Sequence, residues 1–205
     1  MNFDILISFV IATATLAISP GPDNIFVLMQ SVVHGKKYGI STIAGLMSGC
    51  LVHTTFVAFG VSTIIKENNT IFLVIKLLGA IYLCFLSYRV FKSDATITMT
   101  TENIQKKTPF QLFKMGFMMN VLNPKVTIFF LALFPGFLFS NELSTVVQFY
   151  VLGGVFILVS FVIFSTIALL GGSISERIQQ NKQIGIWLKW MQIIVFIGIA
   201  LFILI

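Results

Sequence analysis

Two long stretches of the chain, residues 38–65 and 143–175, contain no Asp, Glu, Lys or Arg. Each is longer than the roughly 20 residues that an α-helix needs to cross the hydrocarbon core of a bilayer. The rest of the chain is similar, since 57% of its residues are hydrophobic and 10% are charged, against roughly 45–50% and about 25% in soluble domains. A soluble fold of this size could not bury so much apolar surface, so the sequence predicts an all-α integral membrane protein.

We expect about six membrane-spanning helices in a single transmembrane domain. They are residues 3–30, 39–65, 70–91, 110–139, 144–170 and 184–205. The first stretch has neither a basic leading segment nor a small-residue cleavage site, so it is expected to be a retained helix rather than a cleaved signal. The first and fourth stretches differ from the others because each carries proline and a charged residue inside its apolar run.

The basic residues indicate the orientation, because cytoplasmic loops of membrane proteins carry an excess of Lys and Arg. One side of the membrane has Lys66 in its loops, whereas the other side and its flanks have ten basic residues: Lys36, Lys37, Arg89, Lys92, Lys106, Lys107, Lys114, Arg177, Lys182 and Lys189. We therefore expect both termini to lie outside the cytoplasm. The formal net charge of +6 follows from these loops, and no nucleic-acid partner is expected.

The chain shows faint internal similarity between residues 1–91 and 110–205, which a polar cytoplasmic linker at about residues 92–109 joins. Gly21-Pro22-Asp23 corresponds to Asn123-Pro124-Lys125, and similar short matches follow in each half. Each half holds three spans, so the second half would enter the membrane inverted relative to the first. Inverted repeats are a common transporter architecture, in which the substrate site lies where the corresponding broken helices meet.

The first apolar stretch contains the most informative segment, Ser19-Pro20-Gly21-Pro22-Asp23-Asn24. The two prolines remove two backbone donors and free carbonyls near Leu16 and Ile18. Such a break persists in a membrane only inside protein or beside a water-filled cavity. Freed carbonyls could receive an ammonium group and the N-terminus of the following half-helix a carboxylate, which are the two charges of an amino acid. The alternative is a packing kink in which Asp23 only caps a helix.

The fourth stretch supplies a counterpart in Asn120, Asn123, Pro124 and Lys125. A charged residue at the centre of a spanning helix costs about 2.5–3.5 kcal/mol, so we expect Asp23 and Lys125 to approach each other or to share a substrate. The alternative is that the Lys125 side chain extends to the cytoplasmic interface.

Other polar and small residues within the spans have both structural and functional interpretations. His53 is the one ionisable residue in the second span, where it could relay a proton or be a hydrogen-bonded core residue. Gly45 and Gly49, like Gly153-Gly154, are expected to allow close helix packing. The two cysteines look like small buried apolar residues. The sequence has no metal-ligand spacing and no phosphate-binding loop, so we expect no metal, no cofactor and no enzymatic activity.

Several of these segments together resemble the LysE/RhtB-type amino-acid exporters. The resemblance covers nearly the whole chain and rests on the segment from Ser19 to Asn24, on Gly45, Gly49 and His53, on Gly79-Ala80-Ile81-Tyr82-Leu83, and on Asn123-Pro124-Lys125 with Phe129-Phe130-Leu131 and Phe134-Pro135. It implies a proton-coupled amino-acid exporter of the bacterial inner membrane, closer to the threonine, homoserine and leucine exporters than to those for basic amino acids. By motif match, it implies a site at Pro20, Gly21, Pro22, Asp23, Asn24, Asn123, Pro124 and Lys125.

The sequence thus favours a secondary-active exporter that takes an amino acid from the cytoplasm and releases it outside in exchange for protons. Asp23 is the first candidate for proton coupling and His53 the second, while Lys125 would contact a carboxylate or keep Asp23 charged. The alternatives are an exporter of another metabolite, a membrane-embedded enzyme, a scaffold subunit and a channel. A homodimer within the lipid bilayer is a candidate assembly, although no residues indicate its interface.

Overall fold

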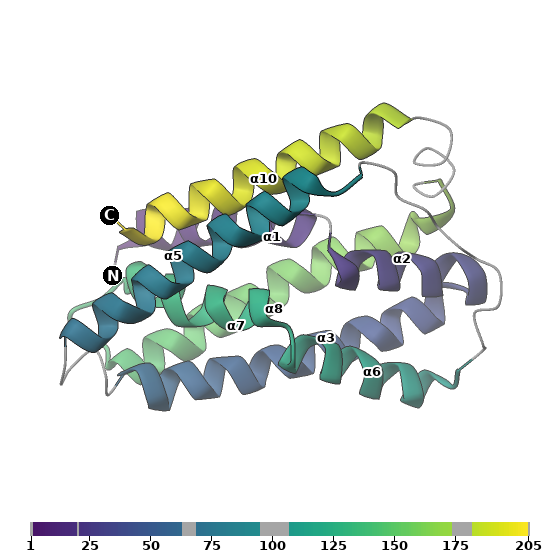
Figure 1. The fold of residues 1–205 in the computed structure, drawn as a ribbon. Helices are drawn as coiled ribbons and strands as arrows, with labels where there is room; N and C mark the ends of the chain where they lie inside the picture. Colours follow the sequence, from purple (N-terminus) through teal and green to yellow (C-terminus); the bar gives the residue numbers. More distant parts are fainter. Residues whose placement is uncertain (1, 20, 63–68, 95–106, 174–181, 205) are drawn as a thin grey trace.

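The computed structural model describes residues 2–19, 21–62, 69–94, 107–173 and 182–204 (Figure 1). Every regular element in these ranges is a helix, which confirms the predicted all-α class. The elements are α1 (Phe3–Ile18), α2 (Pro22–His34), α3 (Lys36–Phe56), η1 (Val57–Val61), α5 (Asn69–Lys92), α6 (Pro109–Val121), α7 (Pro124–Ile128), η2 (Phe129–Leu133), η3 (Phe134–Phe137), α8 (Thr145–Leu169) and α10 (Lys182–Leu204).

The helices account for the predicted membrane spans. Four of them are long and apolar enough to cross a bilayer: Lys36–Val61, Thr70–Lys92, Thr145–Leu169 and Gln183–Leu204. Two bent pairs raise the number to as many as six, because α1 and α2 meet at 61° and α6 meets the segment from Pro124 to Phe137 at 49°. The bent pairs are the first and fourth predicted spans, so the prediction that proline interrupts these two helices is confirmed.

Side chains at the helix starts satisfy backbone donors that have no partner within the helix. The Asn2 carboxamide accepts a hydrogen bond from the Asp4 amide at 3.0 Å, and Thr108 forms a reciprocal capping box with Gln111 at the start of α6. Gly35 separates α2 from α3 with a φ of 101°, a left-handed conformation that glycine adopts without steric cost. These local signals set the helix boundaries at the ends of the bundle.

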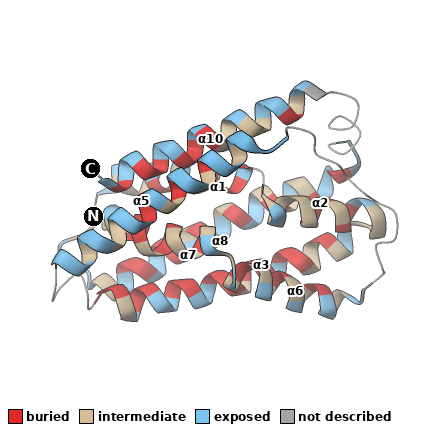
Figure 2. Ribbon diagram, in the orientation of Figure 1, coloured by how far each residue is buried: buried red, intermediate tan, exposed pale blue. Residues whose placement is uncertain are grey.

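The outer surface of the bundle is apolar, as a lipid-facing surface must be. Figure 2 shows exposed residues along the outward faces of the helices and buried residues along their inner faces. Among the large exposed apolar side chains are Phe3, Leu78 and Ile81, and Trp187 is 78% exposed near the start of α10. A soluble protein with these contiguous apolar faces would aggregate, so the exposed surface agrees with the membrane assignment.

Helices α3 and α6 pack closely because glycines lie between them. A methyl group at Gly45 would overlap the backbone of Phe113, and one at Gly116 would overlap the backbone of Thr42. This confirms the expected packing role of Gly45. On α8, Gly153 lies against the Thr54 side chain, whereas a methyl group at Gly154 would meet no atom within 4 Å. The expected packing role therefore holds for Gly153 and is wrong for Gly154.

The start of α1 and the end of α10 lie at the same end of the bundle (Figure 1). The ends of α2 and α5 and the starts of α3, α6 and α10 lie at the opposite end, with the described basic residues of the predicted cytoplasmic loops. Residues 95–106 of the predicted linker lie outside the described residues, as do Lys66 and Arg177. The division into two inverted repeats stays a prediction.

Candidate functional site

The break in the first span leaves carbonyl groups at the end of α1 without helical partners. Gly21 precedes α2 in an extended conformation, and Pro22 occupies the first turn, where its missing N–H costs nothing. The Asn24 side chain turns back and donates a hydrogen bond from Nδ2 to the Ala17 carbonyl at 2.7 Å. The acceptor lies between the two carbonyls expected from the sequence. Pro20 lies outside the described residues.

Asn123 connects the two broken spans. Its Oδ1 accepts a hydrogen bond from the Lys125 amide at 3.0 Å, which caps α7. Its Nδ2 donates to Asp23 Oδ2 at 2.9 Å. One carboxamide therefore stabilises the restart of the fourth span and holds the carboxylate at the restart of the first. Residues 23 and 123 are distant in sequence, so this contact joins the two halves of the chain.

Lys125 follows Asn123 and extends into the same region. Its Nζ lies 5.1 Å from the centre of the Phe196 ring, a cation–π contact, and 3.8 Å from the position that a Cβ atom would take at Gly21. Asp23 and Lys125 are close enough for their charges to interact. In the described part of the chain, Asp23 and Lys125 form no ion pair with each other. The Asp23 carboxylate accepts a hydrogen bond from Asn123 instead.

His53 approaches the site from behind Asn120. Its Nε2 lies 3.1 Å from the Asn120 carbonyl oxygen. Because a carbonyl only accepts hydrogen bonds, Nε2 carries the proton in this contact. The His53 side chain is 6% exposed and tilts against the Phe130 ring at 5.4 Å between centroids. The structure thus shows the hydrogen-bonded core arrangement, in contact with the end of α6.

Asn120 occupies the close approach between α3 and α6. A methyl group at Gly49 would come within 2.7 Å of Asn120 Oδ1. Asn120 Nδ2 lies 3.5 Å from Cys50 Sγ, within the range of a hydrogen bond to sulfur. The absence of a side chain at Gly49 therefore allows the Asn120 carboxamide to lie beside α3, and the predicted packing role of Gly49 includes positioning this side chain.

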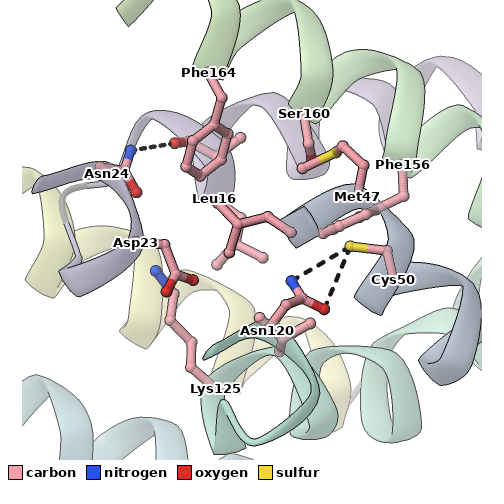
Figure 3. Close-up of a pocket in the computed structure, with 13 residues that line it drawn as sticks. Leu16, Asp23, Asn24, Met47, Cys50, Asn120, Lys125, Phe156, Ser160 and Phe164 are labelled. Atoms are coloured by element: carbon pink, nitrogen blue, oxygen red, sulfur yellow. Dashed lines mark hydrogen bonds between the residues drawn. The ribbon is translucent and has the colours of Figure 1, made fainter. Parts of the chain in front are cut away.

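A small cavity of about 40 Å³, called the central cavity below, lies between the two breaks (Figure 3). Its polar residues are Asp23, Asn24, Asn120, Lys125, Cys50 and Ser160, and its apolar residues are Leu16, Ala17, Leu46, Met47, Val126, Phe156 and Phe164. A buried water needs at least about 10–15 Å³ measured in this way, so the cavity has room for a few waters.

A layer of phenylalanine side chains packs where α1 and α8 meet η2 and η3. The chain leaves η3 beside the N-terminus, since the Asn2 amide donates a hydrogen bond to the Phe139 carbonyl at 2.8 Å. The Phe130 and Phe134 rings stack at 4.1 Å between centroids, and Phe130 meets Phe156 edge to face at 4.9 Å. Phe9 of α1 packs edge to face on Phe134 and Phe137, at 5.1 Å from each. All but Phe156 belong to η2, η3 or α1, so the layer joins the two broken spans.

A larger cavity of about 360 Å³ lies at the opposite end, where Gly21 and Pro22 meet the end of α5 and the start of α10. Its charged lining residues are Asp94 and Lys189. Lys189 Nζ donates a hydrogen bond to the Ser93 carbonyl at 2.7 Å. Gly21 therefore lines this outer cavity. It also lies next to the ammonium group of Lys125, which lines the central cavity.

The structure brings together most of the sequence candidates. Asp23, Asn24, Asn120 and Lys125 line the central cavity and Asn123 holds Asp23. Pro124 is exposed, and His53 contacts the Asn120 carbonyl and the Phe130 ring without lining the cavity. Sequence reasoning missed the wall that α8 contributes, Phe156, Ser160 and Phe164. These residues follow one another at intervals of four, so they share one helix face, but nothing in the sequence distinguishes this face of α8 from its other faces.

Comparison with known proteins places these features in a family. A family model described as "LysE type translocator" matches residues 14–205. The homoserine/homoserine lactone efflux protein of Salmonella typhimurium is 30% identical over 183 residues, 89% of this chain and 88% of that protein. The leucine efflux protein of Klebsiella pneumoniae is 27% identical over 195 residues, 95% of this chain and 92% of that protein. No solved structure matches the chain.

Proposed function

The chain belongs to the LysE type translocator family, and from this premise we propose that it is a secondary-active exporter of neutral amino acids that works by proton antiport in the bacterial inner membrane. The observation that carries the proposal is the central cavity between two proline-broken spans. There a carboxylate, an ammonium group and two carboxamides converge in the interior of the bundle.

The polar side of the cavity suits both charges of an amino acid. The Asp23 carboxylate and the Ala17 carbonyl offer acceptors to a substrate ammonium group, and the Lys125 ammonium offers donors to a substrate carboxylate. Among the described lining residues, Asp23 and Lys125 are the charged ones, one of each sign. A third substrate charge would have no counter-charge there, and burying it would be costly. This favours neutral amino acids over basic or acidic ones.

The relatives' names agree with a neutral substrate. One is named for the efflux of homoserine and homoserine lactone and another for the efflux of leucine. Homoserine and leucine each carry one ammonium and one carboxylate group and an uncharged side chain. The remaining wall of the cavity, which includes Leu16, Phe156 and Phe164, would pack against such a side chain.

Antiport follows from the use of one carboxylate for two cations in turn. In the cytoplasm-facing conformation, Asp23 would release its proton and bind the substrate ammonium. In the outward-facing conformation, a proton would replace the departing substrate, and protonated Asp23 would return. His53, the second candidate for proton transfer, does not line the cavity, and its Nε2 proton bonds to the Asn120 carbonyl, which cannot pass a proton on, so the proposed coupling rests on Asp23.

The surrounding features suggest the transport path. The outer cavity beside Gly21 and Pro22 would admit substrate from the cytoplasm. The layer of phenylalanine side chains around Phe130 would close the path to the outside. The basic residues lie at the end of the bundle that holds the outer cavity, which supports this orientation, with both termini outside the cytoplasm. Rocking of the two halves around the broken helices would open each side in turn.

Efflux from loaded cells tests the proposal. Cells are loaded with dipeptides, and the amino acids that appear outside are measured for the wild type, Asp23→Asn, the exposed-site control Asp4→Asn and an empty vector. We expect wild type and Asp4→Asn to release a few neutral amino acids faster than the vector, and Asp23→Asn to match the vector. Equal release from wild type and vector across all amino acids would refute the proposal, and full activity of Asp23→Asn would remove Asp23 from the mechanism.

A further inference from the structure

Ser160, near the middle of α8, is the feature of the cavity that the ammonium and carboxylate contacts leave unexplained. Its side chain is 2% exposed and lines the central cavity. Its Oγ is buried and forms no hydrogen bond with the described part of the chain. A hydroxyl has one donor and two acceptor positions, so Ser160 presents an unused hydrogen-bonding group to the cavity.

Many other hydroxyl groups on the spanning helices bond to a backbone carbonyl of their own helix, although those of Thr13 and Ser165 do not. Ser31 Oγ donates to the Val27 carbonyl at 2.8 Å, and Thr54 Oγ1 donates to the Cys50 carbonyl at 2.8 Å. Thr166, on the same helix as Ser160, donates to the Val162 carbonyl at 2.9 Å. This bond to the carbonyl four residues earlier is the usual arrangement for serine and threonine within a helix. Ser160 lacks it, and its hydroxyl is left available to the cavity.

The surroundings of Ser160 are apolar. Phe156 and Phe164 lie one turn before and one turn after it on α8, and both line the cavity. Figure 3 shows Ser160 across the cavity from Asp23 and Lys125, with Leu16 between them in this view. Ser160 and the two charged side chains therefore belong to different parts of the cavity wall, so an amino acid bound at Asp23 and Lys125 could contact Ser160 only through its side chain.

We propose that Ser160 binds a hydroxyl group on the substrate side chain, so that the exporter favours hydroxylated neutral amino acids over aliphatic ones of the same size. This inference rests on the proposed function. An aliphatic side chain at this position would leave the Ser160 hydroxyl unpaired in an apolar wall, whereas a hydroxylated one would pair with it. Sites with buried hydrogen-bonding groups reject analogues that cannot pair with those groups.

Isosteric substrate pairs isolate this effect. Homoserine and norvaline differ by a hydroxyl in place of a methyl group, as do threonine and valine. The purified full-length protein is reconstituted in liposomes, and efflux of each amino acid is measured for wild type, Ser160→Ala and Ser165→Ala. Ser165 is the matched control because it lies on the same helix with a buried, unpartnered hydroxyl but does not line the cavity.

We expect wild type and Ser165→Ala to export the hydroxylated member of each pair faster. In Ser160→Ala the ratio of homoserine to norvaline efflux should fall about tenfold, the effect of one buried hydrogen bond. The ratio is taken within each variant, so a general loss of activity cancels. An unchanged ratio in Ser160→Ala, or a wild-type preference for the aliphatic members, would overturn the inference.

Two further outcomes are separable. Should Ser160→Ala export too little to measure, the ratio in Ser160→Cys decides, because a thiol is a weaker donor of similar size. A lowered ratio supports the role of Ser160, and a wild-type ratio refutes it. Absence of efflux of any amino acid by the wild type would refute the proposed function and this inference with it. Efflux with an unaltered ratio would refute the inference alone.

Discussion

The Asn123 carboxamide provides the sharpest test of how the two broken spans are held together. It caps α7 through Oδ1 and holds the Asp23 carboxylate through Nδ2, at 3.0 and 2.9 Å. These two contacts can be separated by substitution. Alanine at position 123 removes both, whereas serine is a good N-cap residue that is too short to replace the carboxamide contact with Asp23.

The magnitudes follow from the two contacts. Loss of an N-cap costs about 1 kcal/mol, and loss of a hydrogen bond to a charged group costs about 1.5–3 kcal/mol. We therefore expect Asn123→Ala to lower the free energy of unfolding by about 3 kcal/mol and Asn123→Ser by about 2 kcal/mol. Both variants should export more slowly, because Asp23 is no longer held in place.

Reversible unfolding in mixed micelles measures these changes, and a double-mutant cycle isolates the contact between the two breaks. The cycle combines Asn123→Ser with Asp23→Ala, and we expect a coupling free energy of about 1.5–3 kcal/mol. Additive effects of the two substitutions would refute the reasoning, because they would mean that the contact contributes nothing. Equal stability of Asn123→Ala and wild type would refute the capping role as well.

Three further outcomes follow from the same structure. Gly49→Ala should destabilise the protein by about 1–3 kcal/mol, because the added methyl overlaps Asn120, whereas the control Gly154→Ala should not destabilise it. Equal effects of the two substitutions on unfolding in micelles would contradict the packing account. His53→Leu should lower the free energy of unfolding by about 1–3 kcal/mol, because the Asn120 carbonyl loses its hydrogen bond, and His53→Gln should restore it. A His53→Leu variant as stable as wild type would argue against that bond. Lys125→Met should raise the half-saturating substrate concentration in efflux assays about tenfold or more, since it removes the ammonium group that binds the substrate carboxylate. An unchanged half-saturating concentration would exclude this role.

The sequence predicts most of the fold because lipid imposes strict rules. Backbone polar groups in the hydrocarbon core must be satisfied within the protein, so long charge-free stretches can only be helices. For the same reason, Pro22 and Pro124 mark the two breaks reliably, and both stand in the first turn of a new helix. The role expected for Gly154 was wrong because adjacent positions on a helix face different directions, and sequence alone does not tell which one meets a neighbour.

The candidate site is predicted only in part. Asp23, Asn24, Asn120 and Lys125 were identified because a polar or charged residue is costly inside a membrane. The partner of Asp23 was not identified, since opposite charge suggested Lys125 and the direct bond is to Asn123. Ser160 carries no such signal, because serine is common in membrane helices and usually bonds to its own backbone. Its role depends on a cavity that only the packed helices reveal.

The measurement that tests the central claim most directly is efflux from proteoliposomes under an imposed pH gradient. Liposomes that contain the purified protein and labelled homoserine are diluted into acidic or equal-pH buffer, for wild type and for Asp23→Asn. The account predicts that the inward proton gradient accelerates wild-type efflux, that a protonophore abolishes the acceleration, and that Asp23→Asn does not respond. Wild-type efflux that is saturable but indifferent to the gradient would contradict proton antiport through Asp23.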